Sequence, residues 1–189
     1  MKFWLTGVLF AALAACESTG DGGGGSTPLQ IVDPASLPVT GAPTYTGTLN
    51  FVLNEGGAGD VTYTGDLSLT ASFAGDTITG DVSNFTDSDA ETYTGTLTLI
   101  NGDIDRGAGA GINPVFADLD GSLTRASDAQ VLESGAAIGG EFFGSAGAAT
   151  PEEVRGTVTG SFCTENCSGG GPPSIVAVEV AGSTFTASQ

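Results

Sequence analysis

The sequence predicts an all-β protein: an eight-stranded antiparallel, mostly up-and-down β-barrel with a filled apolar core, preceded by a disordered tether. Eight segments alternate apolar and polar residues with a period of two, and no segment has a convincing helical pattern. The chain contains 31 glycines, and glycines within strands mark bends or places where backbone packs on backbone. With eight strands the interior of a barrel is just filled by side chains, and closure removes exposed strand edges.

The strands are expected where the alternation is regular. In the second of them, Leu67 and Leu69 share one face and Ser68 lies on the other. Glycine interrupts the apolar face in most strands, so we expect this face to line the core of a soluble barrel rather than to contact lipid. The expected strands cover residues 45–53, 61–73, 78–83, 93–99, 117–123, 136–142, 154–162 and 175–180.

Two of these strands begin with near-copies, YTGTLNF at residue 45 and YTGTLTL at residue 93. They reflect either an old internal duplication or the independent occurrence of the same pattern in two strands that bend, one at Gly47 and the other at Gly95.

Residues 139–162 carry the most specific pattern of the chain. It consists of Gly140-x-Phe142-Phe143-Gly144, a loop of small residues, Glu153-x-x-Gly156-Thr157 and a closing Phe162. This pattern resembles the end of the β-barrel domain of transferrin-binding protein B-like surface lipoproteins, although Ser145 stands where the family usually has proline. Members of that family have two lobes, each with a handle domain beside its barrel, and this chain has room for one barrel only. The resemblance implies a single-barrel surface lipoprotein that binds a host-derived or environmental ligand.

Residues 1–15 have the pattern of a bacterial lipoprotein signal peptide. Lys2 precedes an apolar run that is too short to span a bilayer and ends in Leu13-Ala14-Ala15-Cys16. Cleavage after Ala15 would leave Cys16 as the amino terminus, acylated with chains such as palmitate. The alternative is an ordinary secretory signal with a chance cysteine.

Glu17 follows the predicted lipidation site, where an aspartate would resemble an inner-membrane retention signal. We therefore expect the protein in the cell outer membrane, lipid-anchored and exposed at the surface. Residues 16–44 comprise the lipidated cysteine and a tether with a run of four glycines and four prolines, too poor in periodic apolar positions to fold. Residues 45–189 form the barrel domain.

The charge balance excludes several classes of function. The chain has 22 acidic residues against 4 basic ones and a net charge of -18, so nucleic acid is repelled. It has no histidine, and its only lysine is Lys2, so a Ser/His/Asp triad, a Schiff-base lysine and a histidine-ligated metal site are unavailable. We expect no enzyme activity, no metal and no cofactor. The acids lie in loops or on polar strand faces, as in a solvated surface.

The two cysteines that remain after Cys16, Cys163 and Cys167, are predicted to form a disulfide, as is usual in an exported protein. Asn101-Gly102-Asp103-Ile104-Asp105-Arg106-Gly107 resembles the start of a calcium loop, but Arg106 stands where glycine belongs, and Asn101-Gly102 is also a strong hairpin turn. We therefore favour a turn at this place.

Up-and-down connections would gather the loops at 54–60, 86–92, 125–135 and 163–173 at the end of the barrel away from the membrane. These loops are acidic, and Asp87, Asp89 and Glu91 are the candidate ligand-binding residues. A partner met there, an extracellular protein or a small ligand, is expected to be cationic and electrostatically steered toward a monomeric barrel. The alternative function is a structural envelope lipoprotein without a specific ligand, whose acidity keeps it soluble.

Overall fold

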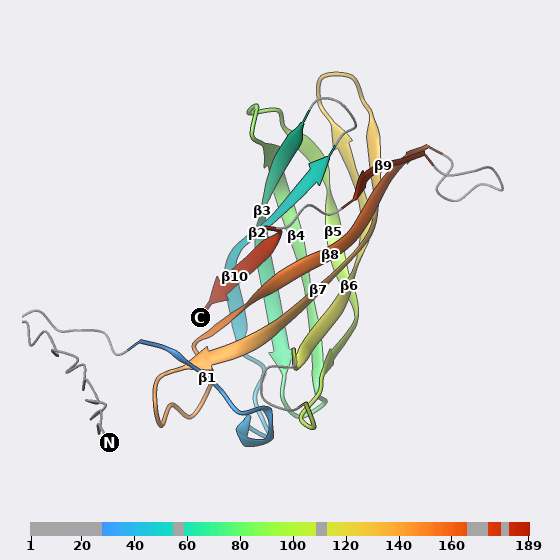
Figure 1. Ribbon diagram of the computed structural model, residues 1–189. Helices are drawn as coiled ribbons and strands as arrows, with labels where there is room; N and C mark the ends of the chain where they lie inside the picture. The colour runs from blue at the N-terminus through green and yellow to red at the C-terminus, as the bar shows by residue number, and fades with distance from the viewer. Residues whose placement is uncertain (1–27, 55–58, 109–112, 166–173, 179–181) are drawn as a thin grey trace, which may run out of the picture.

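The computed structural model describes residues 28–54, 59–108, 113–165, 174–178 and 182–189, and within them the chain is an all-β, closed antiparallel barrel (Figure 1). In the described part of the chain no helix is long and apolar enough to cross a membrane. The elements are β1 (Gln30–Ile31), the 3₁₀ turn η1 (Pro34–Ser36), β2 (Thr44–Asn54), β3 (Asp60–Ser72), β4 (Thr77–Asp87), β5 (Tyr93–Ile104), β6 (Val115–Arg125), β7 (Val131–Gly144), β8 (Glu153–Glu165), β9 (Ser174–Val178) and β10 (Thr184–Ser188).

The barrel is closed by its last strand. Strands β2 to β8 pair with one another in sequence order, and β10 pairs with both β8 and β2. The strand expected at 175–180 corresponds to β9, which pairs only with the distal part of β8, whereas β10 was not predicted. Its five residues are too few to give a clear periodic signal, yet Phe185 and Ala187 point into the core.

The predicted faces are confirmed, and the apolar face lines a filled interior. Leu67 is 2% exposed and Leu69 is 0% exposed, while Ser68 between them lies outside. Aromatic rings stack through the centre of the barrel: the Phe51 ring lies 4.8 Å from that of Tyr63 and 4.6 Å from that of Phe162, between centroids. Such close packing in a core stabilises the fold and leaves little room for a guest molecule.

Two of the inward-facing glycines explain how the wall curves. A side chain at Gly47 would collide with the backbone of Thr186 in β10, and one at Gly95, whose φ is +122°, with the backbone of Ser122 in β6. The near-copies at 45 and 93 therefore place glycine against a neighbouring strand in both cases, as expected for a tightly curved wall.

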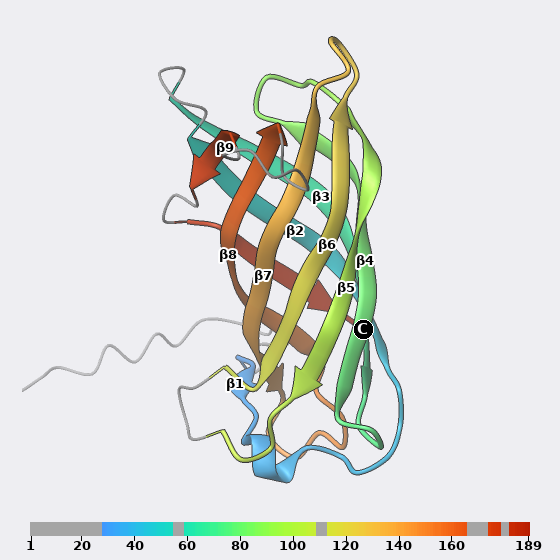
Figure 2. The same cartoon turned by 90° about the vertical axis from the view of Figure 1, so that its right-hand side faces the viewer.

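The loops gather at the two ends of the barrel as the up-and-down order requires. The strand ends that the β2–β3, β4–β5 and β6–β7 connections join lie at one end, which we call the distal end (Figures 1 and 2). The strand ends that the β3–β4, β5–β6 and β7–β8 connections join lie at the other, beside β1 and η1, which we call the tether end. Residues 55–58 and 109–112, and residues 166–173 of the expected loop at 163–173, lie outside the described residues.

Part of the expected tether belongs to the fold. Residues 28–43, which we call the strap, lie across the tether end of the barrel (Figure 2). β1 pairs with the end of β7, Asp33 caps η1 by accepting a hydrogen bond from Ala35 N, and Leu37 is only 3% exposed. The prediction that residues 16–44 are flexible throughout is therefore wrong for the strap. An open barrel end exposes apolar side chains, and three apolar groups of the strap, Val32, Pro34 and Leu37, cover them.

Arg106 fastens the strap to the barrel. Its Nε donates to Asp76 Oδ1 over 2.6 Å, and its Nη1 donates to the carbonyl oxygen of Leu37 over 2.8 Å. Its Nη2 donates to the carbonyl oxygens of Pro38 and Phe73 over 2.6 and 2.8 Å. One guanidinium thus joins the β3–β4 turn, the β5–β6 loop and the strap, and we call this arrangement the latch.

The turn expected at Asn101-Gly102 is a bulge within β5. Asn101 has a φ of +52°, and the register with β6 shifts between Ile100 and Asp103. A left-handed residue followed by glycine suits a bulge as well as a hairpin turn, so β5 continues to Ile104.

Candidate functional site

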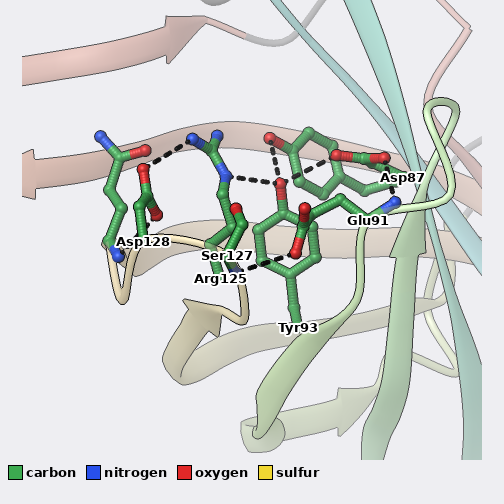
Figure 3. Close-up of polar contacts among 8 residues, drawn as sticks. Asp87, Glu91, Tyr93, Arg125, Ser127 and Asp128 are labelled. Atoms are coloured by element: carbon green, nitrogen blue, oxygen red, sulfur yellow. Dashed lines mark hydrogen bonds and ion pairs between the residues drawn. The ribbon is translucent and has the colours of Figure 1, made fainter.

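Asp87 is the last residue of β4, and the other two predicted site residues, Asp89 and Glu91, follow it in the β4–β5 loop at the distal end. Figure 3 shows Asp87 and Glu91 with the residues around them. The Oδ1 atom of Asp87 accepts hydrogen bonds from the backbone N–H of Asp89 over 2.9 Å and of Glu91 over 3.0 Å. This is an Asx-type turn, in which a short carboxylate replaces the missing backbone acceptors. The Asp87 carboxylate therefore shapes its own loop.

The second oxygen of Asp87 faces a buried tyrosine. Tyr93, 4% exposed, donates from its hydroxyl to Asp87 Oδ2 over 3.0 Å and accepts from Arg125 Nε over 3.1 Å. The hydroxyl oxygens of Tyr93 and Tyr63 lie 3.5 Å apart. Burial raises the pKa of Tyr93, so its hydroxyl stays protonated and can donate.

Glu91 connects the β4–β5 loop to the β6–β7 loop. Its Oε1 accepts from the backbone N–H of Ser127 over 3.0 Å, and Asp128 in the same loop accepts from Gln130 N over 3.0 Å and approaches Arg125 Nη1 at 3.5 Å (Figure 3). We call the network of Asp87, Glu91, Tyr93, Arg125, Ser127 and Asp128 the distal clasp. Two of the three predicted site residues are thus engaged in holding loops together, and only Asp89 points an exposed side chain outward with no bond from its carboxylate to any described residue.

The interior offers no ligand site among the described residues. A gap of about 10 Å³ beside Phe51, Val158 and Phe162 is too small for more than a water molecule. The three tyrosines Tyr45, Tyr63 and Tyr93 are at most 4% exposed and lie in the packed core. Tyr45, for example, donates to the carbonyl oxygen of Pro151 over 3.0 Å.

The outer wall carries a hollow that the sequence did not predict. It has a volume of about 460 Å³, within the roughly 300–1,000 Å³ of typical small-molecule sites, and lies where β7, β8 and β10 run side by side near the tether end. We call it the wall hollow. It is lined by Asn113, Glu141, Phe143, Arg155, Gly156, Thr157, Thr184, Phe185 and Thr186.

Arg155 is held in place within the wall hollow. Its Nε and Nη2 bind the two carboxylate oxygens of Glu153 at 2.9 and 3.0 Å, and its guanidinium lies 4.0 Å from the centre of the Phe143 ring. This fork-shaped pairing and the ring contact fix the orientation of the cation. Nη1 is left without a bond to any described residue.

Other polar groups of the wall hollow are also unengaged. Glu141 lies directly opposite Arg155 in the β7–β8 pair, and Thr157 lies opposite Thr184 in the β8–β10 pair. Within the described part of the chain, none of the side chains of Asn113, Glu141, Thr157, Thr184 and Thr186 makes a hydrogen bond. The polar side chains of the distal clasp are mostly engaged in bonds within the protein, whereas most of those in the wall hollow are not.

Sequence reasoning missed the wall hollow because its parts are far apart along the chain. The signal that could have found it is the outer face of residues 139–143 and 155–157, where glycine, an acid, an aromatic residue and a base alternate with core positions. Only the register of β7, β8 and β10 brings these side chains together.

No cluster of three or more metal-binding side chains forms among the described residues. The lipidation site Cys16, the signal peptide, and Cys167, the predicted partner of Cys163, lie outside the described residues. The lipidation and the Cys163–Cys167 disulfide therefore stay predictions.

No family model, curated protein or solved structure matches the chain.

Proposed function

We propose that the chain is a lipid-anchored binding protein of the cell outer membrane, which presents a rigid barrel at the surface and binds its ligand on the outer wall. The wall hollow is the observation that carries this proposal. It combines a cation held in place, Arg155, with polar side chains whose hydrogen-bonding capacity is unused by the described residues, as is typical of binding sites.

The filled interior supports a site on the outside. The core of the barrel is packed with aromatic rings, and every fully buried side-chain nitrogen and oxygen atom of the described residues has a hydrogen-bond partner. A ligand carried inside would need polar groups or space that these residues do not offer. The outer wall is therefore the better place for recognition.

The amino terminus supports attachment to a membrane. Residues 1–16 have the apolar run, the small residues and the cysteine of a lipoprotein signal, and several acyl chains on one cysteine make a stable anchor. We propose cleavage after Ala15, acylation of Cys16 and sorting to the outer membrane. We also propose the Cys163–Cys167 disulfide, which would shape the connection after β8.

A capture experiment tests the binding function. The mature chain with Cys16→Ser, immobilised, is exposed to envelope and growth-medium components, and the retained material is compared with that from a Glu141→Ala variant. Saturable retention of one component that the variant loses supports the proposal. Retention of nothing, or of material that both proteins hold equally, favours the alternative of a structural envelope lipoprotein without a ligand.

The acidic residues of the distal end lead to a separate prediction about the association rate of a cationic partner. If the captured component is cationic and bound at the β4–β5 loop, its association rate should fall as salt screens the acidic residues. Since Asp87 and Glu91 are engaged in the distal clasp, the exposed Asp89 is the residue to neutralise first.

A further inference from the structure

We propose that the wall hollow binds a neutral saccharide chain. This inference rests on the proposed function and adds to it the chemical class of the ligand. It follows from the kinds of hydrogen-bonding group that the hollow presents, from the apolar surfaces beside them, and from the charge around them.

The first argument concerns donors and acceptors. The free Nη1 of Arg155 can only donate hydrogen bonds, and the carboxylate of Glu141, directly opposite it across β7 and β8, can only accept them. A ligand that satisfies both within a short distance needs groups that accept and donate at once. Hydroxyl groups do so, and a sugar ring carries several on adjacent carbons.

The rest of the lining has the same character. Thr157 and Thr184 form an exposed cross-strand pair, and Thr186 follows two residues along β10 on the same outer face. The amide of Asn113 lies over Gly139, where a side chain would otherwise fill the space. Hydroxyls and an amide that can rotate to donate or accept suit a ligand made of hydroxyl groups.

Apolar surfaces complete the match. Phe143 lines the hollow, and the Arg155 guanidinium lies 4.0 Å from the centre of its ring, so an aromatic and a polar surface meet there. A sugar ring has C–H groups on its faces that pack against aromatic rings and are thereby removed from water. The half-buried ring of Phe143 supplies such a surface beside the polar groups of the hollow.

The surrounding charge excludes the ionic alternatives. The net charge of the chain is -18, and the one cation of the hollow is already paired with Glu153 and faces Glu141. An anion would therefore be repelled by the protein as a whole, and a small cation would have to approach the Arg155 guanidinium. A neutral, polyhydroxylated chain meets neither obstacle.

The test uses the mature chain with Cys16→Ser and three neutral probes, maltohexaose, cellohexaose and the hexamer of N-acetylglucosamine. Binding is followed by titration calorimetry and by NMR shifts of backbone amides. At least one hexasaccharide should bind saturably and shift the amides of residues 139–143 and 155–157. Glu141→Ala should weaken that binding about tenfold or more, because it removes the charged acceptor, and Gly139→Gln should abolish it by filling the hollow.

Thr96→Gln on the exposed outer face of β5 is the matched control, and it should leave binding unchanged. The inference is overturned if none of the three hexasaccharides binds saturably, if neither hollow variant weakens binding, or if a polyuronic-acid hexamer binds as tightly. Should the capture experiment still retain a different component that Glu141→Ala loses, the binding function stands and only the saccharide assignment fails.

Discussion

At the scale of single residues, the latch concentrates four hydrogen bonds on the side chain of Arg106. We expect Arg106→Ala to lower the free energy of unfolding by about 2–3 kcal/mol, because it leaves the Asp76 carboxylate and three carbonyl oxygens without this donor. Urea denaturation measures the change. Arg155→Ala, which removes an exposed ion pair, is the control and should cost about 1 kcal/mol or less. An equal loss in the free energy of unfolding for the two variants would show that the latch does not stabilise the fold as described.

Two buried tyrosines predict an alkaline limit to stability. Burial raises the pKa of Tyr45 and Tyr93 above the ordinary value of 10.0. The unfolded chain therefore loses these protons first, so the stability is fully present below about pH 10 and falls as the pH rises toward the folded-state pKa. The measurement is urea unfolding at pH 8, 9.5 and 10.5. The double variant Tyr45→Phe/Tyr93→Phe should be less stable than the parent protein at pH 8. Its free energy of unfolding should nevertheless fall less than that of the parent between pH 8 and pH 10.5. A loss as steep as that of the parent would show that other groups cause it.

At the scale of elements, the strap is a packed part of the barrel. Leu37→Ala should lower stability by about 2–3 kcal/mol, because this side chain is 3% exposed and its removal opens a cavity at the barrel end. Val39→Ala, two residues along the same strap and 76% exposed, should change stability by less than about 0.5 kcal/mol. The comparison by urea denaturation needs no partner or ligand, and equal effects would mean that the strap does not pack as described.

The same elements show what could be predicted from the sequence. The faces of β2 to β8 follow from the period of two, because each of these strands is long enough for the alternation to identify the buried side. The strap and β10 could not be found in this way. The strap is short and rich in proline, and it is held by a barrel end and by Arg106, neither of which lies near it in the sequence. Asp87 and Glu91 lie at the distal end, Asp87 as the last residue of β4 and Glu91 in the loop that follows, but their engagement with Tyr93 and Ser127 depends on how the loops meet.

At the scale of the whole molecule, the proposed acylation of Cys16 would decide where the barrel is found. We expect Cys16→Ser to move the protein from the membrane fraction to the soluble fraction and to block processing after Ala15, because acylation of the thiol precedes cleavage. Mass spectrometry of the mature amino terminus and fractionation of cells measure the two effects. Cys163→Ser is the control and should leave the protein in the membrane. A mature terminus other than an acylated Cys16 would rule out the lipoprotein assignment.

If Cys16 is acylated as proposed, the docked strap also limits how far the barrel can move from that anchor. A tether that stayed free up to β2 would let the barrel range about 100 Å from Cys16, but with the strap bound only the chain up to Pro28 can extend, which spans about 40 Å at most. In that arrangement the tether end would face the lipid, and the wall hollow, whose residues lie near that end, would open sideways a short distance above the headgroups. Molecules that lie flat along the cell surface can reach such a site, whereas large particles arriving from the medium would meet the distal loops first.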